Sequence, residues 1–194
     1  MGLEKLLEEP RDRVVAAVTV AAAAAFLVVN FLFEPCNSLM AAAGAGILDF
    51  EFAWTAERAE EILAGWLAGS GGGSVVPCAV HVNVVDFAYM PAYGFTGFGL
   101  VVLVTRRLSG GWRRAGLRLA LLPLVAAAFD VVENVNLLVM LGSVGAAGVS
   151  SVNPVNAALA SACATIKFAA LLAAIGFFAA ALAKLAASRK SSTE

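Results

Sequence analysis

Four long apolar stretches constrain the fold of this chain more than any other feature. They cover residues about 14–33, 75–105, 117–141 and 155–185. Each is long enough to cross about 30 Å of hydrocarbon, which takes about 20 helical residues. A helix also satisfies its own backbone polar groups inside lipid. The sequence therefore predicts an all-α polytopic membrane protein: a four-transmembrane-helix bundle forming one membrane domain over residues 1–194.

The composition supports the same class. Hydrophobic residues make up 61% of the chain and charged residues 14%, whereas a soluble domain has about 25% charged residues. A soluble fold of this length could not keep so much apolar surface away from water. No long basic run or basic–aromatic pattern indicates nucleic-acid binding. The expected partner is the lipid bilayer, and the sequence is compatible with either a monomer or an oligomer.

The basic residues predict the orientation. Basic clusters lie before the first stretch, between the second and third, and in the tail, whereas the 34–74 segment is acidic and has only Arg58 as a basic residue. The residues of the three clusters are Lys5, Arg11, Arg13, Arg106, Arg107, Arg113, Arg114, Arg118, Lys184, Arg189 and Lys190. By the positive-inside rule, both termini should be cytoplasmic in a multi-pass protein of the cell (plasma) membrane. The first stretch is longer than a signal-peptide core, so we expect an uncleaved span.

The 34–74 segment should form an external loop with a helix of its own. Apolar residues recur at helical spacing over residues 50–67, opposite several acidic ones. This pattern predicts an amphipathic helix with Trp54 and Trp66 at the membrane interface. A cap on the outer end of the bundle is the favoured interpretation, and a lid over a site is the alternative. The glycine-rich residues 69–74 would form a flexible tether.

Two cysteines should lie at the external face. Cys36 follows the first span and Cys78 opens the second, in a compartment where disulfides persist. A Cys36–Cys78 disulfide is one hypothesis, and unpaired packing cysteines are the other. Cys163 lies inside the fourth span and fits a packing role. The cysteines and His81 match no metal-binding pattern, so no metal or cofactor is predicted.

Polar and charged residues inside the spans are the candidate site. Ionisable side chains cost about 2.5–3.5 kcal/mol each at mid-membrane on insertion scales. Helical spacing places the polar residues of span two on one stripe and those of span three on another. At 1.5 Å per residue, Asp86, Asp130, Glu133 and Lys167 all lie roughly 12–18 Å from the outer surface. The candidate ligand- or ion-binding residues are Asn83, Asp86, Tyr89, Tyr93, Asp130, Glu133, Asn134 and Lys167.

The charges of this layer do not balance. Asp86, Asp130 and Glu133 against Lys167 leave −2 if all are ionised. In a low dielectric we expect a bound proton or cation to compensate. The alternative is a structural network that locks the helices together by hydrogen bonds and an ion pair. No nucleophile–base motif is present, so no catalytic residue is assigned.

The order of several motifs resembles a group of uncharacterised prokaryotic membrane proteins with four spans. The motifs are Leu48-Asp49-Phe50, Asp86-Phe87-x-Tyr89-x-x-x-Tyr93-Gly94, Phe129-Asp130-x-x-Glu133-Asn134 and Lys167-Phe168. The Asp-x-x-Glu-Asn element in the third span is the most specific. The resemblance covers about residues 14–180. It implies the four-span fold and marks the same acidic layer, but it implies no activity.

Three functions stay open on this basis. The first is a small transport or ligand-binding protein with an intramembrane acidic and lysine site for a proton, a cation or a lipid-like ligand. The second is a membrane enzyme acting on a lipid-like substrate, with Glu133 or Asp86 as acid or base. The third is a structural subunit of a membrane complex.

Overall fold

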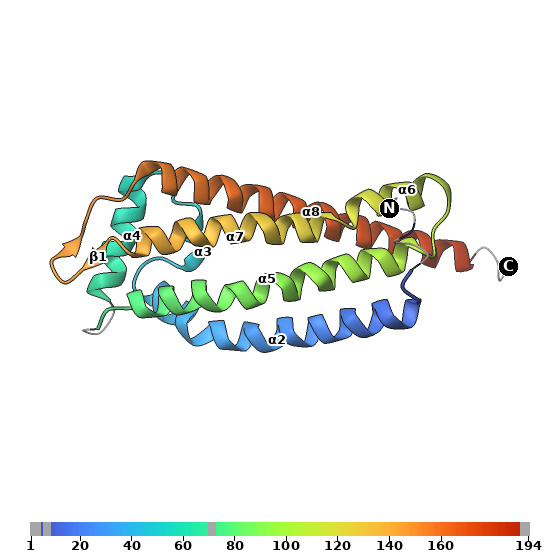
Figure 1. The fold of residues 1–194 in the computed structure, drawn as a ribbon, viewed down its shortest axis with the longest axis horizontal. Coiled ribbons are helices and arrows are strands. Elements are labelled where there is room, and N and C mark those ends of the chain that lie inside the picture. The colour runs from blue at the N-terminus through green and yellow to red at the C-terminus, as the bar shows by residue number, and fades with distance from the viewer. Residues whose placement is uncertain (1–4, 6–8, 70–72, 191–194) are drawn as a thin grey trace. The chain divides into compact units, whose positions relative to one another are not determined.

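The computed structural model is all-α, as predicted, and describes residues 5, 9–69 and 73–190. Its long helices are α2 (Asp12–Ala42), α5 (Val76–Thr105), α7 (Leu122–Leu141) and α8 (Pro154–Lys190) (Figure 1). With α6 (Gly110–Leu119) and α7 taken together, four helical segments are long and apolar enough to cross a membrane. The predicted spans are confirmed, and α2 continues past the predicted end at Phe33, through Pro35.

Shorter elements connect the long helices. Between α2 and α5 lie α3 (Ile47–Glu51) and α4 (Ala56–Ala68), where a helix was predicted over residues 50–67. Thr55 caps α4, because its Oγ1 accepts a hydrogen bond from the Arg58 N–H. A small antiparallel hairpin, β1 (Val144–Gly145) and β2 (Gly148–Val149), joins α7 to α8. Part of the predicted glycine-rich tether, residues 70–72, lies outside the described residues.

The chain divides into two compact units, each described by itself. Unit 1 comprises Met1–Ala25, Pro91–Ala127 and Phe168–Glu194, and unit 2 comprises Phe26–Met90 and Ala128–Lys167. Every long helix contributes a segment to both units.

Unit 2 has an apolar core under α4. Ile62, Leu63 and Trp66 of α4 are buried against Phe50 of α3. The prediction that Trp66 lies at the membrane interface is wrong: its side chain is fully buried. Its indole N–H donates to the Ala45 carbonyl at 2.8 Å, which removes the usual reason for an indole to stay near water.

Two covalent or polar links fasten the loop segment of unit 2. Cys36 near the end of α2 and Cys78 near the start of α5 form a disulfide, with their Cα atoms 5.0 Å apart. The Glu60 carboxylate of α4 accepts a hydrogen bond from the Val152 N–H at 2.8 Å. The segment between α2 and α5 is thus held at both ends and in its middle.

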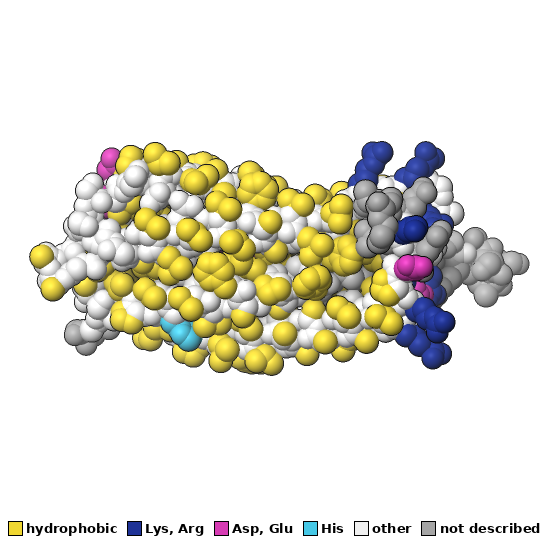
Figure 2. Space-filling model, in the orientation of Figure 1, with side chains coloured by type: hydrophobic (Ala, Val, Ile, Leu, Met, Phe, Trp, Pro, Cys, Tyr) yellow, Lys and Arg dark blue, Asp and Glu magenta, His cyan; other side chains and the backbone are white. Residues whose placement is uncertain are grey.

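Unit 1 packs through small residues. A Cβ on Gly99 of α5 would lie 3.0 Å from the Cβ of Thr19 on α2. A Cβ on Gly116 of α6 would lie 2.9 Å from the ring of Phe177 on α8. Glycine at these positions permits the close helix approach common in membrane proteins. The face in Figure 2 shows apolar side chains along the helices and dark-blue lysines and arginines gathered at the α6 end of unit 1.

Candidate functional site

Three carboxylates of unit 2 surround the ammonium of Lys167. The Nζ atom lies 2.9 Å from Oε1 of Glu133, 3.0 Å from Oδ1 of Asp130 and 3.3 Å from Oε2 of Glu51. Asp130 and Glu133 lie one turn apart on α7, Lys167 lies on α8, and Glu51 ends α3. Residues separated by as many as 116 positions therefore form one cluster, which we call the lysine–carboxylate cluster.

The lysine–carboxylate cluster is almost completely removed from solvent. The exposed fraction of the side chain is 0% for Glu133, 3% for Asp130, 7% for Lys167 and 11% for Glu51. An ammonium has three N–H donors, and Lys167 donates one hydrogen bond to each of the three carboxylates. The lysine is thus matched to three acceptors, each from a separate residue.

The backbone around Glu51 is held by Ser161 of α8. The Ser161 hydroxyl donates to the Glu51 carbonyl at 2.8 Å and accepts from the Trp54 N–H at 2.9 Å. Trp54 has a φ of +60°, a left-handed conformation that is uncommon for a bulky residue. Ser161 therefore links α8 to the turn between α3 and α4, beside Glu51.

Asp86 of α5 joins the site through α7. The Asn134 side-chain amide donates a hydrogen bond to Oδ2 of Asp86. Asn134 is buried and Asp86 is half-buried, which makes Asp86 the more accessible of the two. Asn134 is the residue after Glu133, so this pair connects α5 with the helix that carries two members of the cluster.

The other predicted site residues take different roles. The Asn83 amide donates to the Ala79 carbonyl of its own helix at 2.8 Å. The Tyr89 hydroxyl accepts from Asn30 of α2 at 3.2 Å, and the Tyr89 ring stacks on Phe26. Tyr93 belongs to unit 1, whereas the lysine–carboxylate cluster belongs to unit 2.

Hydrogen bonding at the site is incomplete. Oε2 of Glu133 and Oδ1 of Asn83 are buried and have no hydrogen-bond partner among the described residues. Buried polar atoms in folded proteins are nearly always paired, and an exception marks a role for water, ions or chemistry.

The surroundings of Glu51 shift the pKa of its carboxyl group. Burial raises the pKa of the Glu51 carboxyl above its ordinary value, while the charge of Lys167 opposes that increase. Burial is the largest effect, because taking a carboxylate out of water disfavours its charged form. Glu51 therefore holds a proton more tightly than an exposed glutamate does.

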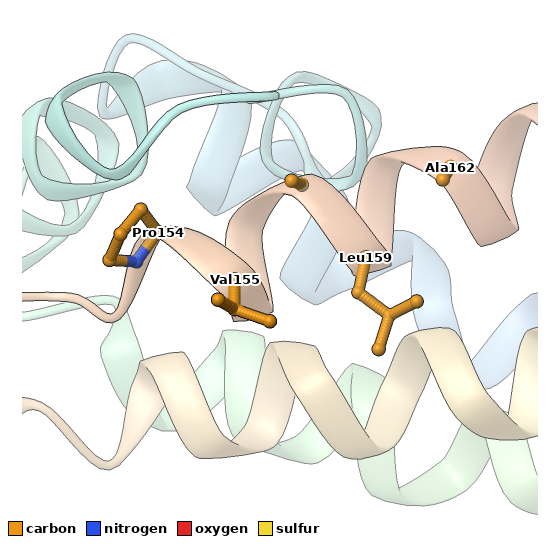
Figure 3. Close-up of a pocket in the computed structure, with 5 residues that line it drawn as sticks. Pro154, Val155, Leu159 and Ala162 are labelled. Atoms are coloured by element: carbon orange, nitrogen blue, oxygen red, sulfur yellow. The ribbon is translucent and has the colours of Figure 1, made fainter.

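Unit 2 also has an apolar groove along the start of α8. It has a volume of about 510 Å³ and is lined by Pro154, Val155, Ala158, Leu159 and Ala162. Figure 3 shows the side chains of Val155 and Leu159 along this helix. None of the carboxylates lines the groove, so it does not place a lipid-like ligand against an acid or base.

Sequence reasoning missed Glu51 and Ser161. Glu51 follows apolar Phe50 and precedes Phe52, a context that could have indicated burial. Its place in an acidic external segment favoured a solvated side chain instead. Placing Glu51 near Lys167 also adds a negative charge to a site that was already predicted to be negative. The charge balance therefore gave no reason to include Glu51 in the site.

The fold and the site define an all-α protein with four candidate membrane helices and a buried cluster of carboxylates around a lysine. Comparisons with protein-family models, curated proteins and solved structures found no match.

Proposed function

We propose that this chain is a small membrane protein of the transport or ligand-binding kind whose lysine–carboxylate cluster binds and releases protons. One observation carries the proposal: three buried carboxylates share one ammonium. Three negative charges and one positive charge leave −2 when all four groups are ionised. Asp86 adds one further negative charge nearby when it is ionised.

A charge of −2 in a dry site is unfavourable, because each unpaired ion retains a desolvation penalty of several kcal/mol. Bound protons remove that penalty. Lys167 Nζ already lies 2.9–3.3 Å from one oxygen of each carboxylate, so a metal ion would compete with the ammonium for those oxygens. A proton needs no such space. Closely spaced carboxyls of this kind share protons and titrate as one coupled set.

The arrangement also supports two places for proton exchange. Glu51 belongs to the segment between the spans and has the most exposed side chain of the cluster, at 11%. Asp86 is half-buried and hydrogen-bonded to Asn134. Protons would enter or leave through these two residues and be held at Glu133 and Asp130. The lipid-enzyme and structural-subunit alternatives explain the charge imbalance less directly.

The pH dependence of thermal stability tests the proposal. The protein in nanodiscs should have a melting temperature that changes with pH, and Asp130→Asn and Glu133→Gln should flatten that dependence. Glu61→Gln, at an exposed position of α4, is the matched control and should leave the profile unchanged. Folded Asp130→Asn and Glu133→Gln variants with the wild-type profile would contradict the proposal.

We further propose that both termini are cytoplasmic in the plasma membrane, with the segment between α2 and α5 outside. The arginines between α5 and α7, set against the acidic residues of residues 34–74, support this orientation by the positive-inside rule. A C-terminal fusion to a reporter that is active only in the cytoplasm should be active. Activity of a reporter that works only outside the cell would contradict it.

A further inference from the structure

We infer that α6 is a binding site for the headgroups of anionic phospholipids. This goes beyond the proposed proton site and does not depend on it, because every residue involved belongs to unit 1. The sequence of α6, Gly-Gly-Trp-Arg-Arg-Ala-Gly-Leu-Arg-Leu, is polar on one side and apolar on the other. Amphipathic helices with basic residues and tryptophan lie in the membrane interface.

The apolar side of α6 is fixed to its neighbours. Gly116 is buried, and its close approach to Thr105 and Phe177 brings α6 against α5 and α8. The Trp112 ring lies 6.1 Å from the Phe177 ring, and the Lys184 ammonium lies 5.4 Å from the centre of the Trp112 ring. The helix is thus held in place before any lipid binds, with Trp112 37% exposed.

The polar side of α6 presents three arginines. Arg113, Arg114 and Arg118 are exposed and have no ion-pair partner among the described residues. Arg114 and Arg118 are one turn apart and therefore share a face. The nearby carboxylate of Asp12 is already paired with Arg106 at 2.6 Å and lies 3.7 Å from Arg107.

The location identifies the anion. Helix α6 lies at the end of unit 1 where the apolar surface gives way to lysines and arginines (Figures 1 and 2), the level expected for phospholipid phosphates. A guanidinium binds a phosphate with two parallel hydrogen bonds. Basic residues beside a span attract anionic lipids, each by up to about fivefold in affinity. The i, i+4 pair Arg114 and Arg118 is suited to one or two adjacent headgroups.

Electron spin resonance of spin-labelled lipids tests the inference. The protein is reconstituted in phosphatidylcholine vesicles with a trace of spin-labelled phosphatidylglycerol or spin-labelled phosphatidylcholine, and the motionally restricted fractions are compared. Wild type should prefer phosphatidylglycerol, and Arg114→Gln with Arg118→Gln should reduce that preference severalfold. Arg114→Lys with Arg118→Lys should keep part of it, because the charge remains while the paired hydrogen bonds are lost.

The matched control removes the same charge elsewhere in unit 1. Arg11→Gln with Arg13→Gln changes two exposed arginines that lie before α2 and in its first turn and should reduce the preference less than Arg114→Gln with Arg118→Gln does. An equal loss in both double variants would overturn the inference, since net charge alone would then explain it. No phosphatidylglycerol preference in wild type, or one that survives Arg114→Gln with Arg118→Gln, would also overturn it. Because all four positions are exposed, the free energy of unfolding of each variant should lie within about 0.5 kcal/mol of the wild-type value.

Discussion

The carboxylate of Glu51 lies 3.3 Å from the ammonium of Lys167, although Glu51 ends a five-residue helix outside the spans and Lys167 lies within α8. This contact joins the segment between α2 and α5 directly to the charged interior of unit 2. A change in the protonation of the cluster should therefore alter the position or stability of that segment. A movement of the segment should in turn alter the protonation of the cluster.

Removing the ammonium should strongly destabilise the protein. Lys167→Met leaves three buried carboxylates without their shared cation, and breaking a buried ion pair on one side costs about 3–5 kcal/mol. Lys184→Met, at an exposed position of the same helix, loses only a cation–π contact worth about 1 kcal/mol. Thermal unfolding in detergent measures both. Equal melting temperatures for the two variants would mean that the cluster does not support the fold.

The raised pKa of Glu51 predicts how stability depends on pH. Its folded-state pKa lies above the unfolded value, so folding is favoured most below the unfolded pKa. This contribution is lost as pH rises through the folded-state pKa. Glu51→Gln should therefore reduce the decline in melting temperature toward alkaline pH, whereas Glu57→Gln at an exposed position of α4 should not. A wild-type slope in Glu51→Gln would assign the pH dependence to other groups.

Ser161 should control the order of the turn that carries Glu51. Ser161→Ala leaves the Trp54 N–H and the Glu51 carbonyl without their partner, at a cost of about 1–3 kcal/mol. Hydrogen exchange over residues 48–55 should become faster. Thr165→Ala removes only a hydrogen bond to the Ser161 carbonyl one turn away and serves as the control. Unchanged exchange in Ser161→Ala would show that the turn is held by its apolar contacts alone.

The Cys36–Cys78 disulfide should stabilise the folded state by about 4 kcal/mol, the chain-entropy value for a sequence separation of 42. Replacing both cysteines by alanine tests this by thermal unfolding. Thiol labelling of unfolded, unreduced protein from membranes should modify Cys163 alone, and reduction should expose two further thiols. Three labelled cysteines before reduction would show that the bond is absent.

The sequence predicted those parts of the fold and site that follow from regular helices. Span length identified the four membrane helices, and rise per residue placed Asp130, Glu133 and Lys167 at a common depth, where the structure brings them together. Asn134 and Asp86 also meet as their stripes predicted.

The remainder depended on irregular backbone and on individual contacts. Glu51 contacts Lys167 beside a turn in which Trp54 takes a left-handed conformation and its N–H donates to Ser161, and no periodicity reveals such a turn. Trp66 can be buried because its indole N–H donates a hydrogen bond to the Ala45 carbonyl, and the sequence pattern does not reveal this acceptor. Tyr89 lies on the predicted stripe but bonds to Asn30 of α2, a partner that helical spacing alone could not select.

Infrared spectroscopy of the carboxyl groups tests most directly whether the lysine–carboxylate cluster holds protons. Wild-type protein in lipid at pH 7 should show the carbonyl stretching band of protonated carboxyl groups, and this band should weaken as the pH is raised. The band should shrink in Asp130→Asn, Glu133→Gln and Glu51→Gln, but not in Glu61→Gln. A wild-type spectrum without protonated carboxyl groups at pH 7, or a band that all of these variants retain in full, would contradict the account.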